Sequence, residues 1–264
     1  MEYKKTYVPQ KGYTCLSKIG ESSLQLIEFG IVELWEGDCL TFDTQDKETA
    51  FIILSGQASF RFDDQDWPDV GGRRSVFEGR AHSVYLPRGK QVEISARMHF
   101  KAAVCGAPIE EDTQPQLVLP EQTRRVKLGT QPWERVTDFI IDEHTNARRL
   151  TIGEAYITPG NWAGFPPHKH DQDRMPEESI YQEIYYYLFR PQQGFALQYL
   201  YTKDGSLDKC YAVRQDELVE FPYGYHTTVG APGYHTYFLW ASAGDHQGFF
   251  RANDPDHDWV SALE

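Results

Sequence analysis

The chain has 264 residues, of which 40% are hydrophobic and 14% aromatic, and its formal net charge is −13. That length can form one large β-domain or two smaller ones, and the aromatic excess suits strands. The negative charge repels phosphate backbones and anionic lipids, so the composition argues against nucleic acid and membrane partners.

The start of the chain and its cysteines predict a cytoplasmic protein. No apolar run follows Lys4 and Lys5, which argues against a signal peptide, and no stretch approaches the length of a transmembrane helix. The cysteines form no CxxC pair, as expected for free thiols in a reducing compartment. They are Cys15, Cys39, Cys105 and Cys210.

Most apolar segments are short and end at Gly, Pro, Asp or Asn, which predicts an all-β protein. In the first half, strands are expected at residues 30–35, 50–54, 57–62 and 83–86. In the second half they are expected at residues 149–157, 183–189, 196–201, 218–221 and 236–240. The segments 183–189 and 196–201 are expected to form a hairpin around residues 191–194.

Two landmarks in the first half recur in the second. A strand ends at Gly56 and a later one at Pro87-Arg88-Gly89; their counterparts end before Gly194 and at Pro222-Tyr223-Gly224. The counterparts lie 138 residues (56 to 194) and 135 residues (87 to 222) further along the chain. Two nearly equal offsets indicate two copies of one barrel.

The second half also holds a pattern typical of a metal site. His168 and His170 are two residues apart on an extended segment, so their side chains point to the same face. Both imidazoles can reach one ion at roughly 2.0–2.2 Å. Glu183 begins the next strong strand, and His226 follows the turn at Pro222 to Gly224. Three histidines and one glutamate are the ligand set of a cupin barrel.

The ligand types suit Zn or Mn, with Fe(II) as a further option, and the sequence does not choose among them. Two histidines and one carboxylate alone would form the facial triad of iron oxygenases, whereas a third histidine favours Lewis-acid chemistry. Glu177 and Glu178 lie in the loop after the histidine pair, but a strand holds a ligand more firmly than a loop does. Glu183 is therefore the expected carboxylate ligand.

The first half has no equivalent pattern. Residues 44–49 occupy the place of the histidine pair, and His82 and His99 are isolated. We therefore expect two tandem cupin barrels of the jelly-roll type, of which the second binds metal. The expected division is residues 1–106 for the metal-free barrel, 107–142 for a proline-rich connector and 143–264 for the metal-binding barrel.

Several motifs extend this pattern. They lie at residues 158–162, 166–171, 176–178, 183–187, 224–226, 232–234 and 254–259. Together they resemble the 5-deoxy-glucuronate isomerases of inositol catabolism, strongly from about residue 148 to the end and more loosely before it. The resemblance implies a bicupin with a metal in its second barrel. It also implies interconversion of 5-deoxy-D-glucuronate and 2-deoxy-5-keto-D-gluconate.

The chain departs from that family at two places. Residues 239–244 lack the usual Asn before Ala-Gly, and Gln215-Asp216 stands where Gly-Asp is usual. The related 4-deoxy-5-ketouronate isomerases share the fold and ligand pattern but have a shorter gap between the histidine pair and the glutamate. The long gap from His170 to Glu183 favours the inositol-pathway enzyme, and the departures keep a related keto-deoxyuronate as an alternative substrate.

An aldose–ketose isomerisation needs an electrophile at the carbonyl oxygen and a base near the carbon. The expected bases are Glu177 and Glu178, and the tyrosines expected to pass a hydroxyl proton are Tyr185 and Tyr187. The cations expected to bind the substrate carboxylate are Lys169, Arg174 and Arg190.

Two other classes of function compete with an isomerase. An Fe(II) cupin dioxygenase predicts two histidines and one carboxylate, so the third histidine argues against it. A non-enzymatic sugar-binding cupin, such as a sensor module, is weakened by the lack of a DNA-binding helix pair or basic patch. The oligomeric state is left open, with a homo-oligomer as one option.

Overall fold

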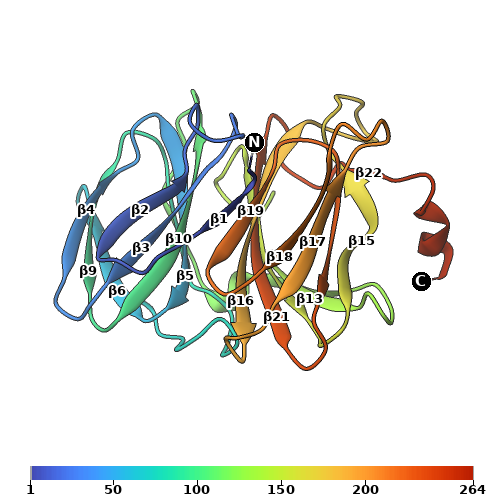
Figure 1. Ribbon diagram of the computed structural model, residues 1–264. Helices are drawn as coiled ribbons and strands as arrows, with labels where there is room; N and C mark the ends of the chain where they lie inside the picture. Colours follow the sequence, from blue (N-terminus) through green and yellow to red (C-terminus); the bar gives the residue numbers. More distant parts are fainter. Residues whose placement is uncertain (1, 264) are drawn as a thin grey trace. The chain divides into compact units, whose positions relative to one another are not determined.

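The computed structural model describes residues 2–263, which form 22 strands and two short 3-10 helices (Figure 1). This composition confirms the all-β prediction. Neither of the helices formed by residues 2–263 has the length and apolar character needed to span a bilayer. The four cysteines are all free, as expected from their spacing.

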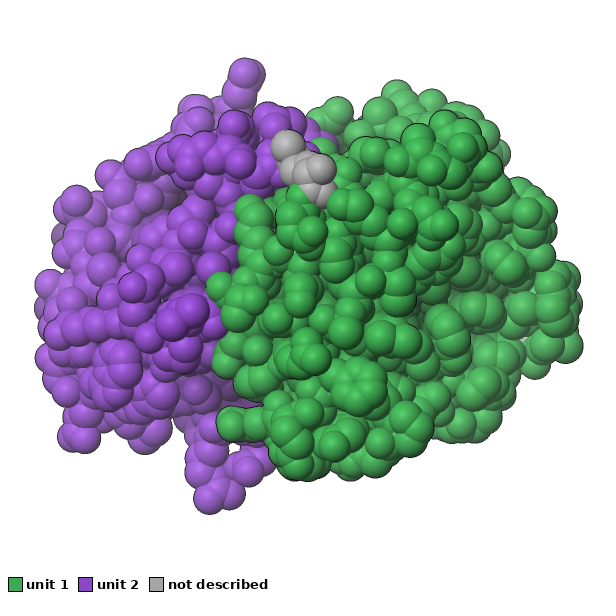
Figure 2. All heavy atoms as spheres, viewed as in Figure 1, with its two compact units in different colours: residues 1–6, 125–139, 152–264 green, residues 7–124, 140–151 purple. Residues whose placement is uncertain are grey.

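The chain divides into two compact units, which Figure 2 distinguishes by colour. Unit 1 comprises Met1–Thr6, Arg125–Phe139 and Ile152–Glu264, and unit 2 comprises Tyr7–Arg124 and Ile140–Thr151. The segment expected to be a connector contributes strands to sheets. The division at residues 106 and 142 stays a prediction about folding domains.

Unit 2 is built from a six-stranded sheet, in the order β11-β8-β5-β10-β3-β2, and a four-stranded sheet, in the order β4-β9-β6-β7. Apolar residues of both sheets form one core, in which the rings of Phe51 and Phe60 meet edge to face at 5.5 Å. Its elements are β2 (Gly12–Ser17), β3 (Glu28–Leu34), β4 (Cys39–Asp43), β5 (Lys47–Ser55), β6 (Gln57–Phe62), β7 (Gln65–Gly71), β8 (Ser83–Leu86), β9 (Gln91–Ala96), β10 (Phe100–Pro108), β11 (Gln116–Val118) and η1 (Pro120–Gln122).

Unit 1 is built from a seven-stranded sheet, in the order β1-β19-β16-β21-β14-β13-β12, and a five-stranded sheet, in the order β18-β17-β20-β15-β22. Its core again draws on both sheets. Its elements are β1 (Lys4–Thr6), β12 (Arg124–Leu128), β13 (Arg135–Ile141), β14 (Leu150–Ile157), β15 (Trp162–Lys169), β16 (Tyr181–Arg190), β17 (Ala196–Tyr201), β18 (Asp208–Val213), β19 (Glu217–Phe221), β20 (Tyr225–Gly230), β21 (His235–Gly244), β22 (Ala252–Asn253) and η2 (Asp258–Leu263).

The two units repeat one topology. Adding 11 to each strand number converts the order β8-β5-β10-β3-β2 into β19-β16-β21-β14-β13, and β4-β9-β6-β7 into β15-β20-β17-β18. The repeated strands, five in one sheet and four in the other, face each other as the two sheets of a jelly roll. The structure thus confirms the duplicated fold that the spaced landmarks predict.

The expected hairpin of segments 183–189 and 196–201 is wrong. β16 pairs with β19 and β21 in one sheet, whereas β17 pairs with β18 and β20 in the other. The chain therefore crosses between the sheets at residues 191–195 instead of folding back on itself. Local turn residues signal the reversal of the chain but not the sheet to which the next strand adds.

Candidate metal centre

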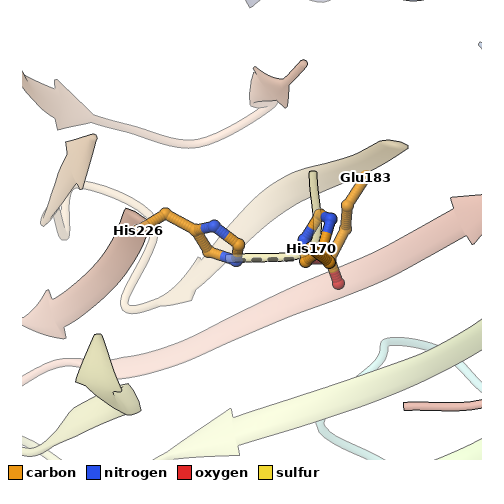
Figure 3. Close-up of side chains that lie close together, drawn as sticks. All are labelled: His170, Glu183 and His226. Carbon is orange, nitrogen blue, oxygen red and sulfur yellow. Dashed lines mark hydrogen bonds and ion pairs between the residues drawn. The ribbon is translucent and has the colours of Figure 1, made fainter. Parts of the chain in front are cut away.

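Three of the four expected ligands converge between the two sheets of unit 1 (Figure 3). His170 follows the last residue of β15, His226 lies on the neighbouring strand β20, and Glu183 lies on β16 of the opposite sheet. One ligand atom from each residue lies within 4.8 Å of the others. All three side chains are buried. The cluster therefore forms where the two halves of the jelly roll face each other.

The carboxylate of Glu183 lies close to both imidazoles. Its Oε2 is 3.2 Å from Nε2 of His170 and 3.3 Å from Nε2 of His226. Burial alone would raise the pKa of Glu183, but the two imidazoles lower it to about 2. Burial lowers the pKa of His226. An ionised carboxylate beside a neutral imidazole is the protonation pattern that a divalent metal requires of its ligands.

The hydrogen bonds around the cluster leave room for a cation. Nδ1 of His170 lies 2.6 Å from the carbonyl oxygen of Tyr181, to which it can donate, so Nε2 is the nitrogen that faces Glu183 and a cation. Among residues 2–263, neither ring nitrogen of His226 has a hydrogen-bond partner of good geometry. Buried polar atoms are rarely left unpaired. A divalent cation held by His170, Glu183 and His226 would satisfy these nitrogens, so the residues present fit a metal.

His168, the fourth expected ligand, lies beside this cluster and is turned toward an arginine. Its ring centroid is 4.5 Å from that of His226, with which it is in register across β15 and β20. Its Nε2 lies 3.4 Å from Nη1 of Arg251. Burial, followed by the charge of Arg251, holds the pKa of His168 well below its ordinary value. Gly164 makes room for this ring, because a Cβ there would lie 3.2 Å from Cε1 of His168.

A cavity of about 220 Å³ opens against the cluster, within unit 1. Glu183 and His168 form part of its wall, and most of the remainder is aromatic or aliphatic. The other lining residues are Leu128, Arg135, Thr137, Phe139, Ala155, Gly164, Tyr181, Tyr185, Phe238, Trp240, Phe249 and Arg251. A small polar molecule in this cavity would lie next to Glu183 and His168.

Of the two tyrosines expected to handle protons, Tyr185 lines the cavity. Its ring stacks on Phe238 at 4.3 Å. Burial and the nearby charge of Glu183 raise the pKa of Tyr185 well above its ordinary value. The hydroxyl of Tyr187 instead lies 2.5 Å from Oε1 of Gln198 and 3.2 Å from Oγ1 of Thr228, away from the cavity wall.

Glu178 lies in a network of its own. The residue is fully buried, and its carboxylate accepts from Lys169 at 2.7 Å, from Arg174 at 2.6 Å and from the backbone N–H of Asp171 at 2.9 Å. Burial opposes ionisation, but the two cations lower the pKa of Glu178. The structure thus brings Lys169 and Arg174 to Glu178, not to the cavity. Glu177 is exposed and does not line the cavity either.

The cations that do line the cavity are Arg135 and Arg251. Arg190, the remaining expected cation, is exposed at the last position of β16, opposite His235. Neither lining arginine lies in a motif that would have identified it from the sequence. Arg135 begins β13 in the segment expected to be a connector, and Arg251 precedes the two-residue strand β22.

Comparisons with known proteins place the chain in a family. Residues 3–260 match the model of the KduI/IolB family. The chain is 36% identical over 238 residues to 5-deoxy-glucuronate isomerase of Geobacillus kaustophilus, covering 89% of the chain and 86% of that protein. It is 34% identical over 242 residues to 5-deoxy-glucuronate isomerase of Bacillus subtilis strain 168, covering 90% of the chain and 89% of that protein.

Two solved structures have a fold similar to that of this chain. An IolB-like protein from Salmonella typhimurium LT2 superposes with a TM-score of 0.94 at 29% identity, covering 99% of this chain and 100% of that one. A mutant of Bacillus subtilis oxalate decarboxylase superposes with a TM-score of 0.66 at 12% identity, covering 100% of this chain and 81% of that one. The second likeness concerns the fold alone, and it confirms the bicupin prediction.

Proposed function

Because the chain belongs to the KduI/IolB family, we propose that it is a metal-dependent 5-deoxy-glucuronate isomerase of myo-inositol catabolism. The reaction converts 5-deoxy-D-glucuronate, an aldehyde, into 2-deoxy-5-keto-D-gluconate, a ketone. The observation that carries the proposal is the buried cluster of His170, Glu183 and His226 against a small cavity. We place the reaction in the cytoplasm, where the four free cysteines would stay reduced.

His168, His170, Glu183 and His226 are the proposed ligands of a divalent metal, with Zn or Mn favoured and Fe(II) as the alternative. When bound, such an ion supplies a Lewis acid that draws charge from the carbonyl oxygen and acidifies the neighbouring C–H bond. His168 joins the set in this proposal by turning its Nε2 from Arg251 toward the other ligands.

The isomerisation moves one hydrogen from C2 to C1 and one hydroxyl proton from O2 to O1, with no net oxidation. The raised pKa of Tyr185 keeps its hydroxyl protonated, so it is suited to donate a hydrogen bond to an oxygen on which charge develops. Phe139, Phe238 and Trp240 give one part of the cavity wall an apolar character. Glu177 and Glu178 stay candidate bases on the sequence argument alone, because neither lines the cavity.

The proposal is tested by incubating the purified protein with 5-deoxy-D-glucuronate in D2O and recording proton NMR spectra with and without a chelator. We expect the aldehyde signal to disappear as the ketose signals grow, and we expect the chelator to stop this conversion. No conversion by protein confirmed to carry metal would refute the assigned substrate. Oxygen consumption in the same assay would instead indicate a dioxygenase.

A further inference from the structure

We infer that Arg251 recognises the carboxylate of the substrate and thereby restricts the enzyme to sugar acids; this inference rests on the proposed function. A uronate carries a carboxylate at the end of the molecule remote from its aldehyde. In a protein with a net charge of −13, that group needs a local cation to offset the repulsion of the surrounding field.

The charge distribution of the cavity supports this assignment. Among the residues that line it, the cations are Arg135 and Arg251 and the carboxylate is Glu183. Glu183 belongs to the proposed metal site, where a bound divalent cation would neutralise its charge. The two arginines therefore give the rest of the cavity a positive character, with aromatic and aliphatic side chains between them. Lys169 and Arg174 do not contribute, because Glu178 accepts hydrogen bonds from both.

Arg251 is the better placed of the two cations. Within residues 2–263 it makes no ion pair with a carboxylate, and its Nη1 lies 3.4 Å from Nε2 of His168. A guanidinium presents five N–H donors in a planar fork that matches the two oxygens of a carboxylate. Arg251 can therefore form a paired hydrogen bond to a ligand while it stands next to the candidate metal ligands.

Arg135 provides a second, more fixed charge. It is buried at the start of β13, and Nη1 lies 3.4 Å from the carbonyl oxygen of Trp133. A held guanidinium contributes potential to the cavity but has less freedom to adjust to a ligand. We therefore assign recognition of the carboxylate to Arg251 and a supporting electrostatic role to Arg135.

The experiment compares two substrates in three variants. The substrates are 5-deoxy-D-glucuronate and 5-deoxy-D-glucose, which has a hydroxymethyl group in place of the carboxylate. The variants are R251M, R251K and R214M, the last as a control because Arg214 is exposed and does not line the cavity. Metal content and the far-ultraviolet circular dichroism spectrum are measured for each variant, so that loss of metal or of fold is recognised.

We expect R251M to lower kcat/KM for the uronate about 10- to 100-fold, mainly through KM, because it removes a charged hydrogen bond. The same change should leave the slower turnover of 5-deoxy-D-glucose within about threefold. R251K should recover part of the loss, and R214M should match the unsubstituted protein. Equal losses on both substrates would overturn the inference, because Arg251 would then act through the metal ligands or the fold.

If the protein proves not to be this isomerase, the role of Arg251 can still be tested by measuring sugar binding. If the unsubstituted protein turns over neither sugar, calorimetric titration of both sugars into the zinc-loaded protein and into R251M decides the question. Tighter binding of the uronate, lost in R251M, would retain Arg251 as the carboxylate site of a different enzyme. Equal binding of the two sugars to the unsubstituted protein would exclude it.

Discussion

Units 1 and 2 share one topology but differ at the mouth of the jelly roll. In unit 1, Glu183 on β16 is paired with Phe221, the residue before the Pro222 turn. In unit 2, Thr49 on β5 is paired with Leu86, the residue before the Pro87 turn. Thr49 therefore occupies the place of the carboxylate ligand. Both positions are buried, so the exchange replaces a charge with a hydroxyl without changing the scaffold.

The histidine positions differ in the same way. Pairing of β15 with β20 puts His168 opposite His226, and pairing of β4 with β9 puts Asp43 opposite Gln91. Two residues beyond Asp43 is Gln45, in the place of His170. Unit 2 retains a cavity of about 460 Å³ lined by Asp43, Gln45 and Thr49, without the imidazoles. The fold thus provides a cavity in both units, and the side chains at these equivalent positions supply the candidate metal ligands in unit 1.

The largest effect is expected when Glu183 of unit 1 is replaced by threonine, the residue at the equivalent position 49 of unit 2. Glu183→Thr should abolish stoichiometric metal binding, measured by elemental analysis, because the anionic ligand is lost between two imidazoles. Isomerase activity should fall about 10³-fold or more with it, because a positioned charge at the reacting oxygen is removed.

The matched control changes the equivalent position in unit 2. Thr49→Val removes a hydroxyl from a buried site of similar size and should leave metal content and activity unaltered. A full complement of metal in Glu183→Thr, or loss of metal in Thr49→Val, would contradict the assignment of the centre to unit 1.

The sequence predicted those features that depend on local spacing. Alternation along β16 puts Glu183 and Tyr185 on one face, and the shared Pro-x-Gly turns disclosed the duplication. The cluster of His170, Glu183 and His226 followed from these regularities.

Other features depend on long-range packing and had no local signal. β1 at the start of the chain pairs with β19, more than 200 residues later. Arg251 reaches the cavity wall from beyond the last long strand. The sequence predicted that Lys169 and Arg174 bind the substrate carboxylate. In the structure both form ion pairs with the fully buried Glu178 instead.

The second test concerns a segment that unit 2 does not have. Residues 171–179 follow the histidine pair, whereas only residues 44–46 separate β4 from β5. Glu178 holds this longer segment through Lys169 and Arg174. Glu178→Gln should lower the free energy of unfolding at pH 7 by about 2 kcal/mol, because buried Lys169 loses one of its two carboxylate partners and keeps only Asp171. Urea unfolding followed by fluorescence provides the measurement.

The difference in free energy of unfolding between the unsubstituted protein and Glu178→Gln should depend on pH. The pKa of Glu178 is lowered in the folded state, so its stabilisation is present above the ordinary carboxyl pKa and is lost as the pH falls toward the folded value. The difference in free energy of unfolding between the unsubstituted protein and Glu178→Gln should therefore become smaller as the pH is lowered. The exposed neighbour provides a control, because Glu177→Gln should change stability by less than about 0.5 kcal/mol. If this difference in free energy of unfolding instead increased as the pH was lowered, the ion pairs of Glu178 could not be its cause.

The smallest expected effect concerns one hydroxyl group. Tyr185 is paired with Val219 as Phe51 is paired with Val84, so unit 2 carries phenylalanine at the place of Tyr185. Tyr185→Phe should retain metal and lower kcat about tenfold, because one hydrogen bond to the developing charge is lost. Tyr199→Phe, on a strand that does not line the cavity, should leave kcat unchanged. An unaltered kcat in Tyr185→Phe would mean that this ring serves packing alone, as Phe51 does in the core of unit 2.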